Sequence, residues 1–230
     1  MDTSILEFDH VSGKKGKFRL QDIHFALPAG YIMGLMGANG AGKSTLFDYI
    51  MNESVRYEGH IRIDGVDIRE NHAYIKNKIG FVSEENAFLE DGIAKFTTQD
   101  NARLLGRFYE QFEPEIFNGA MEEMQVSLNR PYGRLSRGEK LKFQMAFAMA
   151  HHARIYLLDE VTVGMDPVFR LDFFKILQRV IETEQASVLM TSHIESEMKQ
   201  KTDYLGILQE GRLIQFGESL DTFFEAGRSL

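Results

Sequence analysis

A glycine-rich octapeptide that directly follows an apolar run constrains the fold of this chain more than any other feature of its sequence. Residues 31–36, YIMGLM, are apolar apart from one glycine, which is typical of a strand buried on both faces. The octapeptide GANGAGKS occupies residues 37–44, and a helical pattern through Leu46, Tyr49 and Ile50 follows it. A strand, a glycine-rich loop and a helix in this order predict an α/β core with a phosphate-binding loop.

The loop supplies the groups that bind phosphate. Its glycines allow backbone N–H groups to turn inward around phosphate oxygens without obstruction by side chains. The pattern places the Lys43 ammonium at the β- and γ-phosphates of a nucleotide and the Ser44 hydroxyl at Mg²⁺. We therefore expect a nucleotide site that consists of Gly37, Asn39, Gly40, Ala41, Gly42, Lys43, Ser44 and Thr45.

A second apolar strand ends in two acidic residues. In IYLLDE, residues 155–160, the strand carries Asp159 to its carboxyl end, which is the edge at which α/β sheets place ligands. Asp159 is suited to hold Mg²⁺ through water, and Glu160 is suited to polarise an attacking water molecule. Together with the loop, this acidic pair predicts hydrolysis of a nucleotide.

The remaining pattern indicates a single domain with an insert. Residues 94–128 have apolar residues at the three- and four-residue spacings of helices, whereas strand patterns occur on both sides of this region. This order of strand and helix patterns predicts a core of about residues 1–83 and 150–230, interrupted by a mostly helical subdomain of about residues 84–149. The strands expected besides 31–36 lie near 5–8, 18–25, 60–65, 154–159, 186–192, 204–209 and, as a closing hairpin strand, 211–217.

Composition argues against several other classes of protein. The 230 residues include 34 acidic and 26 basic ones, a net charge of −8, and no long basic run, so no nucleic-acid partner is expected. The chain contains no cysteine, which excludes disulfides and thiolate metal sites. The first residues lack the apolar core of a signal peptide, and no window approaches ~18 uninterrupted apolar residues. We expect a soluble protein of the cytoplasm.

The stretch LSRGEKLKF, residues 135–143, has the pattern of a helix start. Ser136 and Glu139 have the capping-box spacing, in which each side chain bonds the backbone N–H of the other residue. A helix N-terminus also attracts anions, because its first N–H groups lack partners within the helix and its dipole is positive there. The local pattern fits both an ordinary capped helix and a helix that faces a phosphate.

Five motifs in order give the chain a resemblance to the ATP-binding subunits of ABC transporters. GANGAGKST matches the first nucleotide motif of that family, LSRGEK its signature and IYLLDE its second nucleotide motif. VGMDP, residues 163–167, matches the D-loop, and TSH, residues 191–193, matches the switch histidine. The resemblance covers nearly the whole chain and is strongest to ATPases of bacterial exporters. It implies a P-loop NTPase fold with a RecA-like core, an antiparallel β subdomain and an inserted helical subdomain.

The resemblance also implies roles for these motifs. Lys43, Glu160 and His193 would act in catalysis, with His193 contacting the γ-phosphate and orienting the attacking water. In this family two subunits dimerise head to tail, so the signature of one chain would cap the ATP of its partner, and Asp166 would lie at the dimer interface. The signature residues are Ser136, Arg137, Gly138 and Glu139, and the histidines read as structural are those at positions 10, 24, 60, 72, 151 and 152.

Several positions depart from the family pattern. Lys15 stands where an aromatic residue usually stacks on adenine. Phe18 is a nearby substitute, although a buried strand phenylalanine explains it about equally well. Glu84 replaces a glutamine that serves in Mg²⁺ binding and coupling, and a carboxylate can still bind Mg²⁺. The other departures are Arg137 and Glu139 in the signature, and Val161 where a proline normally stands.

The resemblance implies a function and its partners. The chain is expected to bind ATP and Mg²⁺, to hydrolyse ATP as a homodimer, and to energise a separate membrane permease on the inner face of the cell membrane. The surface around Glu84–Gly92, with the apolar residues Phe88, Leu89 and Ile93, is expected to receive a short helix of the permease. Two alternatives stay open: a soluble ABC ATPase that acts on nucleic acid or ribosomes, and a regulatory subunit of low activity in a heterodimer.

Overall fold

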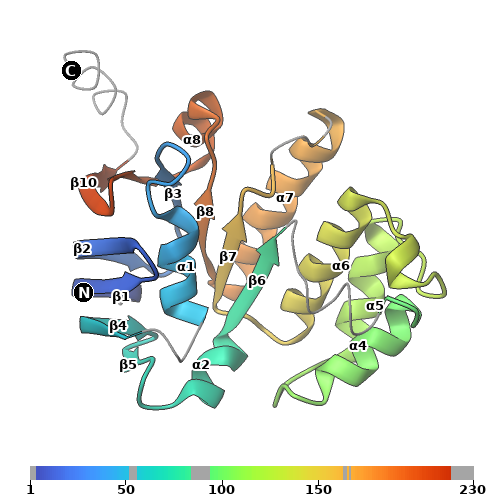
Figure 1. The fold of residues 1–230 in the computed structure, drawn as a ribbon. Helices are drawn as coiled ribbons and strands as arrows, with labels where there is room; N and C mark the ends of the chain where they lie inside the picture. The colour runs from blue at the N-terminus through green and yellow to red at the C-terminus, as the bar shows by residue number, and fades with distance from the viewer. Residues whose placement is uncertain (1–3, 52–55, 84–93, 163–164, 166, 219–230) are drawn as a thin grey trace. The chain divides into compact units, whose positions relative to one another are not determined.

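The computed structural model describes residues 4–51, 56–83, 94–162, 165 and 167–218 of the chain (Figure 1). These residues belong to two compact units, of which the first comprises residues 1–72 and 187–230 and the second residues 73–186. Three predictions lie outside the described residues, namely Glu84 as a Mg²⁺ ligand, Asp166 at a dimer interface, and the docking segment at 84–93. The subdomain boundaries near residues 83 and 150 stay a prediction.

The first unit contains an antiparallel sheet of four strands. Its strand order is β2 (Phe18–Pro28), β1 (Ser4–Lys15), β4 (Tyr57–Ile63) and β5 (Val66–Asp67), and every neighbouring pair is antiparallel. β1 is longer than the strand predicted near residues 5–8. The reason is that two register shifts with β2 follow Phe8, and such bulges interrupt the alternation of apolar and polar residues.

The same unit holds the strand that leads into the glycine-rich loop. β3 (Ile32–Met36) lies between β8 (Ser187–Thr191) and β9 (Tyr204–Gln209) and is parallel to both. Nearly every residue of β3 and β8 is buried, which explains why both strands read as continuous apolar runs. β10 (Arg212–Glu218) pairs antiparallel with β9, which confirms the predicted hairpin strand. α1 (Lys43–Met51) follows the loop.

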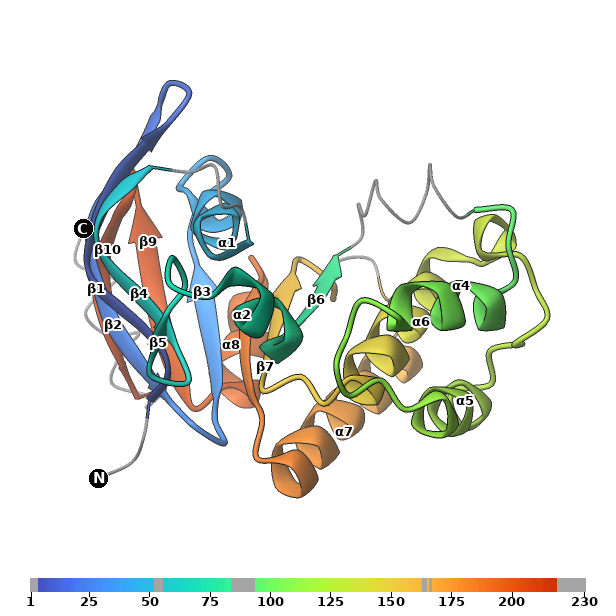
Figure 2. The same ribbon diagram turned by 90° about the horizontal axis from the view of Figure 1, so that it is seen from below.

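Aromatic contacts join the two sheets of the first unit. The rings of Phe8 and Phe25 stack with their centroids 4.9 Å apart, and the Phe25 ring contacts Phe216 of β10 at 5.7 Å. Figure 2 shows β9 and β10 beside β1 and β2 in this unit. The contact between Phe25 and Phe216 therefore packs β10 against the antiparallel sheet. α8 (Glu195–Lys201) follows β8 and completes the described helices of the unit.

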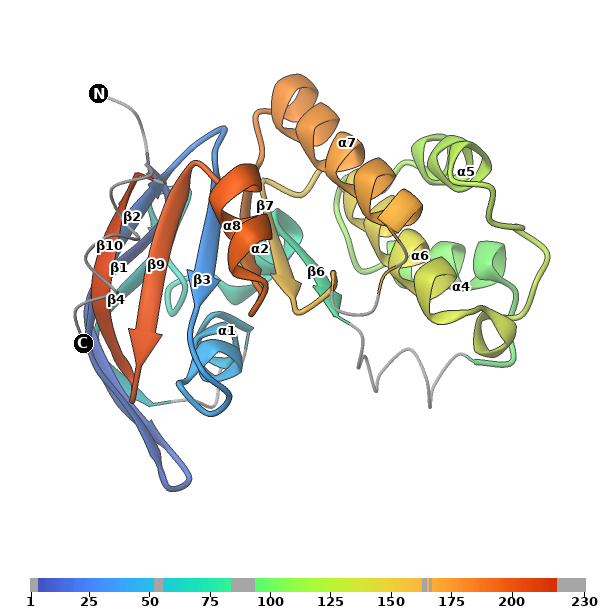
Figure 3. The ribbon, with the colours of Figure 1, turned by 90° about the horizontal axis from the view of Figure 1, so that it is seen from above.

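The second unit contains two parallel strands and several helices. β6 (Ile79–Ser83) pairs with β7 (Ile155–Asp159) in a register that places Ser83 beside Asp159. Figure 3 shows α4, α5 and α6 grouped together in this unit. The helices are α2 (His72–Lys78), α4 (Thr98–Gly106), α5 (Pro114–Glu123), α6 (Arg137–Ala150) and α7 (Pro167–Glu184), with a 3₁₀ turn at Tyr132–Arg134. Within the described ranges, no helix combines the length and the apolar character needed to cross a membrane.

An aromatic cluster forms the core between α5 and α6. The ring centroids of Phe117 and Phe143 lie 5.4 Å apart, and Phe143 also contacts the buried ring of Tyr132 at 5.1 Å. Phe112 and Phe147 extend the cluster with a centroid distance of 5.0 Å. Such pairs contribute about 0.5–1.5 kcal/mol each beyond the burial of apolar area. The cluster fixes α6, the helix that begins at the predicted signature.

Candidate functional site

The loop between β3 and α1 holds its lysine inside it. Lys43 is 5% exposed, and its Nζ donates hydrogen bonds to the carbonyl oxygens of Gly37 at 2.8 Å and Ala38 at 3.4 Å. A backbone hydrogen bond of 3.0 Å from Ala41 to Ala38 closes the turn of the loop. Ser44 is exposed directly after Lys43. The loop therefore presents an ammonium group, a hydroxyl and backbone N–H groups at the start of a helix, which is an arrangement that suits a phosphate.

Phe18 packs against this loop. A Cβ on Gly42 would lie 2.7 Å from the Phe18 ring, and Gly42 has a φ of +114°, so the contact and the backbone both require glycine there. Phe18 is half-buried at the start of β2. Lys15, which stands at the position of the aromatic residue in the family pattern, forms an ion pair with Asp48 of α1. Of these two residues, Phe18 is the one with an aromatic ring at the loop, as a contact with adenine requires.

The turn between β9 and β10 contacts the loop through backbone hydrogen bonds, which the sequence alone did not predict. The backbone N–H of Gly211 donates to the carbonyl of Ala41 at 3.0 Å, and its carbonyl accepts from the N–H of Gln21 at 2.8 Å. Gly211 has a φ of +78°, and a Cβ there would lie 2.0 Å from the carbonyl oxygen of Arg19. The Glu-Gly turn was visible in the sequence, but its contact with a loop 170 residues earlier was not.

His193 lies at the same edge of the first unit as the loop. β3 and β8 are parallel neighbours, with Leu35 paired to Thr191. Gly37 and His193 each lie two residues beyond this pair, at the carboxyl ends of their strands. His193 is exposed, while the hydroxyl of the buried Ser192 before it accepts a hydrogen bond of 3.0 Å from the N–H of Ile194. The structure thus brings the imidazole and the phosphate-type loop to one sheet edge.

Asp159 and Glu160 lie at the end of β7 in the second unit. Asp159 is the last residue of the strand and is half-buried. Glu160 has a φ of +50°, in the left-handed region that residues with a Cβ rarely adopt. Strained backbone of this kind is concentrated at functional sites, where the surrounding structure imposes it. Val161, which replaces the proline of the family pattern, is fully buried. Asp64 and Glu210 adopt the same conformation directly after β4 and β9, so the place of Glu160 beside Asp159, and not its backbone, makes it a candidate for chemistry.

The predicted helix start at Ser136 is confirmed. The Ser136 hydroxyl accepts from the N–H of Glu139 at 3.3 Å, and the Glu139 carboxylate accepts from the N–H of Ser136 at 2.8 Å, so α6 begins with a capping box. Arg130 donates two further hydrogen bonds to Glu139, at 2.8 and 2.7 Å. Burial alone would raise the pKa of Glu139, but the hydrogen bonds from Ser136 and Arg130 outweigh it and lower that pKa. Arg137 is exposed beside them.

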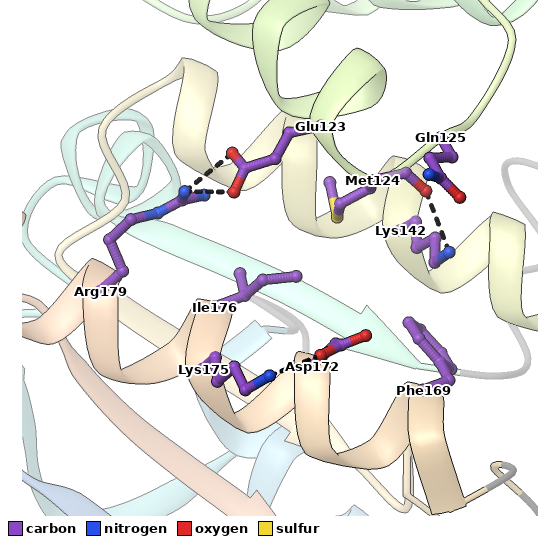
Figure 4. Close-up of a pocket in the computed structure, with 9 residues that line it drawn as sticks. All are labelled: Glu123, Met124, Gln125, Lys142, Phe169, Asp172, Lys175, Ile176 and Arg179. Atoms are coloured by element: carbon purple, nitrogen blue, oxygen red, sulfur yellow. Dashed lines mark hydrogen bonds and ion pairs between the residues drawn. The ribbon is translucent and has the colours of Figure 1, made fainter.

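A groove of about 420 Å³ adjoins the first turns of α6 (Figure 4). At one end, the Lys142 ammonium lies 4.8 Å from the centroid of the Phe169 ring and donates to the Met124 carbonyl at 3.0 Å. At the other end, Arg179 donates to both carboxylate oxygens of Glu123, at 2.6 and 2.7 Å. Arg179 is thus paired with a carboxylate, whereas the contacts of Lys142 are with a carbonyl oxygen and an aromatic ring. The residues that line it are Glu123, Met124, Gln125, Lys142, Phe169, Asp172, Lys175, Ile176 and Arg179.

Three side chains of the antiparallel sheet have the types and spacing of metal ligands. One ligand atom each of Asp9, His10 and His24 lies within 4.8 Å of the others. However, His10 Nδ1 is 2.7 Å from the Asp22 carboxylate, and Arg62 approaches Asp9 at 3.4 Å. The hydrogen bond to Asp22 raises the pKa of His10, which favours the protonated imidazole, and metals bind the neutral form. These contacts favour a charge-balanced sheet surface over a metal site.

The fold and the loop define a class of protein. A glycine-rich loop with a lysine joins the central parallel strand β3 to α1, which is the arrangement of nucleotide-binding proteins of the P-loop class. Residues 20–163 match the family model described as ABC transporter. Because the match spans more than half of the chain, the chain belongs to the ABC transporter family.

Comparisons with individual proteins agree with this assignment. The sequence is 30% identical over 222 residues to the ABC transporter ATP-binding protein NatA of Bacillus subtilis, which covers 94% of this chain and 88% of that protein. It is 29% identical to the ATP-binding protein YtrB of Bacillus subtilis and 28% identical to the bacitracin transport ATP-binding protein BcrA of Bacillus licheniformis. These alignments cover 84% and 81% of this chain but 65% and 60% of the two relatives, so the chain spans less than two thirds of each.

A solved structure shares the fold. The structure of an ATP-binding subunit of an ABC transporter superposes with a TM-score of 0.85 at 24% sequence identity, over 98% of this chain and 94% of that chain. The predicted fold class, a P-loop NTPase of mixed α/β type, is therefore confirmed. The predicted family is also confirmed: the chain is an ATP-binding subunit of the ABC transporter family, and subunits of this kind are ATPases.

Proposed function

We propose that this chain binds ATP with Mg²⁺, dimerises on it, hydrolyses it, and thereby drives a separate permease that exports its substrate. The observation that carries the proposal is the sheet edge of the first unit, where Lys43 lies inside its loop and His193 follows the neighbouring parallel strand. Both groups are suited to the terminal phosphate of a nucleotide, one as a fixed cation and the other as a hydrogen-bonding imidazole.

The nucleotide is bound mainly by the loop. Lys43 exchanges its two carbonyl partners for the β- and γ-phosphates, and the backbone N–H groups of the loop bind further phosphate oxygens. The Phe18 ring, already packed on Gly42, contacts the adenine. The proposed binding residues are Gly37, Asn39, Gly40, Ala41, Gly42, Lys43, Ser44 and Thr45.

The oxygen donors on the chain fit Mg²⁺. This ion prefers hydroxyl, carboxylate and water oxygens, and it usually keeps several waters when it binds beside phosphates. Ser44 is exposed at the loop, and Asp159 ends β7 at its carboxyl end. We assign these two residues, with Glu84, to the Mg²⁺ site. When bound there, the ion would neutralise charge on the phosphates.

Glu160 serves as the general base. It takes a proton from the attacking water as the bond to the γ-phosphorus forms and ADP leaves. His193 contacts the γ-phosphate and holds the water in line. The place of Glu160, directly after Asp159 at the carboxyl end of β7, supports this role.

The site is completed by a second copy of the chain. The start of α6 in one chain faces the ATP bound by the other, with Ser136 and Gly138 nearest the γ-phosphate and Arg137 and Glu139 beside them. Asp166 contacts the partner chain and links the two sites. A Cβ on Gly138 would make only an ordinary contact, 3.5 Å from the Phe169 ring, and this supports the role, because none of the described residues requires a glycine there.

The permease is the second partner. NatA, YtrB and BcrA are named as ATP-binding or transport ATP-binding proteins, and another relative, 31% identical over 208 residues, is the Nod factor export ATP-binding protein I of Rhizobium leguminosarum. All four names support a role in transport, and the name of the last relative supports export. We place the chain on the inner face of the cell membrane, held there by the permease through the segment around Glu84–Gly92.

Glu160→Gln tests the proposal. The variant keeps the size of the side chain, so ATP binding should persist, while hydrolysis should slow by about 10²-fold or more, which is the scale of positioned acid–base catalysis. Steady-state phosphate release and equilibrium dialysis with labelled ATP measure the two properties. Glu122→Gln, an exposed residue of α5, is the matched control and should hydrolyse ATP at the wild-type rate. Near-normal turnover by Glu160→Gln would reject Glu160 as the base.

A further inference from the structure

A buried glutamine of α6 binds the outer edge of β6 at the level of Asp159. The side-chain oxygen of Gln144 accepts from the backbone N–H of Ser83 at 3.0 Å, and its amide nitrogen donates to the backbone carbonyl of Ser83, also at 3.0 Å. Both residues are 5% exposed. The Gln144 side chain thus bonds both backbone polar groups of Ser83, as a neighbouring strand would do.

Ser83 lies at a position where this contact can affect the proposed catalytic site. β6 is the outermost of the described strands in its sheet, so its outer backbone groups have no strand to pair with. Ser83 is also the last residue of β6 and pairs in register with Asp159 on β7. The Gln144 amide therefore fixes the strand end that lies directly beside the proposed Mg²⁺ ligand.

The helix that carries Gln144 is the one that begins at the signature. Gln144 lies seven residues after Arg137, the first residue of α6, which is two turns or about 10 Å along the axis. A capped helix of 14 residues packed by aromatic rings behaves as one rigid element over this distance. α6 also packs directly on β6, where a Cβ on Gly80 would lie 2.6 Å from the Ala148 Cβ. Gln144 adds to this packing the two hydrogen bonds that fix the end of the strand at Ser83.

We propose that Gln144 is a positioning residue for ATP hydrolysis, which couples the signature helix α6 to the carboxyl end of β6 and so holds the edge that carries Asp159 in its catalytic geometry. Gln144 touches neither nucleotide nor metal and acts through Ser83. The inference rests on the proposed ATPase function. It gives a chemical reason for a buried, uncharged amide in the middle of a helix face that is otherwise apolar.

Gln144→Met tests the role, because methionine has a similar length and no hydrogen-bonding amide. The turnover number should fall by about 10²-fold, the scale expected when a catalytic group shifts by about 1 Å, while the affinity for ATP stays unchanged. Amide hydrogen exchange at Ser83 should also accelerate. Gln144→Leu, which also lacks both hydrogen-bonding groups and buries no charge, should show the same loss of turnover and serves if the methionine variant does not fold.

The control separates positioning from simple stability. Thr98→Val removes another buried hydrogen bond, the one of 2.8 Å from the Thr98 hydroxyl to the Ser127 carbonyl, in a part of the unit remote from β6 in sequence. It should lower Tm and leave the turnover number of the folded protein unchanged. If Gln144→Met lowers Tm in the same way with full turnover, Gln144 is structural only and the inference is wrong. Absence of turnover in the wild-type protein, measured alongside, would instead reject the proposed function, and this inference with it.

Discussion

Replacing Gly138 with alanine separates a role within the chain from a role toward a partner. Gly138 is the second residue of α6, and a Cβ there would lie 3.5 Å from the nearest atom, on the Phe169 ring, which is an ordinary van der Waals contact. Alanine is favoured over glycine in a helix by about 0.5–1 kcal/mol. For a chain of this length, that gain corresponds to a rise in Tm of about 1–4 °C.

The same methyl group should abolish most of the catalysis. In the proposed dimer, Gly138 approaches the γ-phosphate bound in the partner chain, and an added methyl group pushes the two chains apart at that point. A displacement of about 1 Å in a catalytic constellation lowers the rate by about 10²-fold. Binding of ATP to the loop around Lys43 should be unaffected, because that loop belongs to the same chain as its own nucleotide. The variant should therefore be more stable and less active.

Thermal melting, ATP affinity and ATPase rates over a range of protein concentrations measure these effects. Gly119→Ala is the matched control, because Gly119 lies within α5 and a Cβ there would meet no atom within 4 Å. It should give a similar rise in Tm with an unchanged ATPase rate. A Gly138→Ala protein that hydrolyses ATP at the wild-type rate would refute the proposed contact with the partner's ATP.

Mixing two inactive variants tests the contact directly. In a mixed head-to-tail dimer of Gly138→Asp and Lys43→Ala chains, one composite site carries both lesions and the other carries neither. Some turnover should return when such dimers form, as confirmed by mass, and each variant alone should stay inactive. Wild-type turnover by Gly138→Asp alone would rule out a signature that acts on the partner's nucleotide.

Two further predictions concern affinity and stability. Phe18→Ala should weaken ATP binding by about 0.5–1.5 kcal/mol, measured by equilibrium dialysis, if the ring contacts adenine as well as Gly42; unchanged affinity in a folded variant would leave Phe18 as a packing residue only. Burial of His151, which is 4% exposed, lowers its pKa from 6.5 to about 4. As the pH falls through this range, the histidine becomes protonated in the unfolded chain but stays neutral in the folded chain. Urea unfolding should show that stability declines by about 3 kcal/mol between pH 6.5 and 4 from this residue, and His151→Phe should remove that part of the decline, whereas an unchanged slope would contradict it.

Local features of the site were predictable from the sequence because neighbouring residues determine them. The apolar strand, the glycine-rich loop and α1 follow one another without interruption, so their order alone predicted the phosphate-type loop. The capping box is equally local, since Ser136 and Glu139 are three residues apart and bond each other. In both cases the sequence distance between interacting groups is within one turn of a helix or one loop.

Contacts between distant segments could not be predicted in this way. Gly211 donates to Ala41 across 170 residues, and Gln144 bonds Ser83 across 61 residues, so neither pair is visible without the fold. A buried glutamine within an apolar helix face was a possible signal for the second pair.

The first turn of α6 shows how a capped helix can also face a phosphate. Four N–H groups at a helix start have no acceptor within the helix. The capping box uses two of them, since Ser136 and Glu139 each accept from the other's backbone N–H. Lys140 makes the first bond within the helix, to the carbonyl of Ser136. The capping box therefore leaves the N–H group of Gly138 for another acceptor, and Gly138 also lacks a side chain that would keep an acceptor away. Gly138 thus combines a backbone donor with open access to it. We infer that the acceptor that approaches this donor comes from outside the chain.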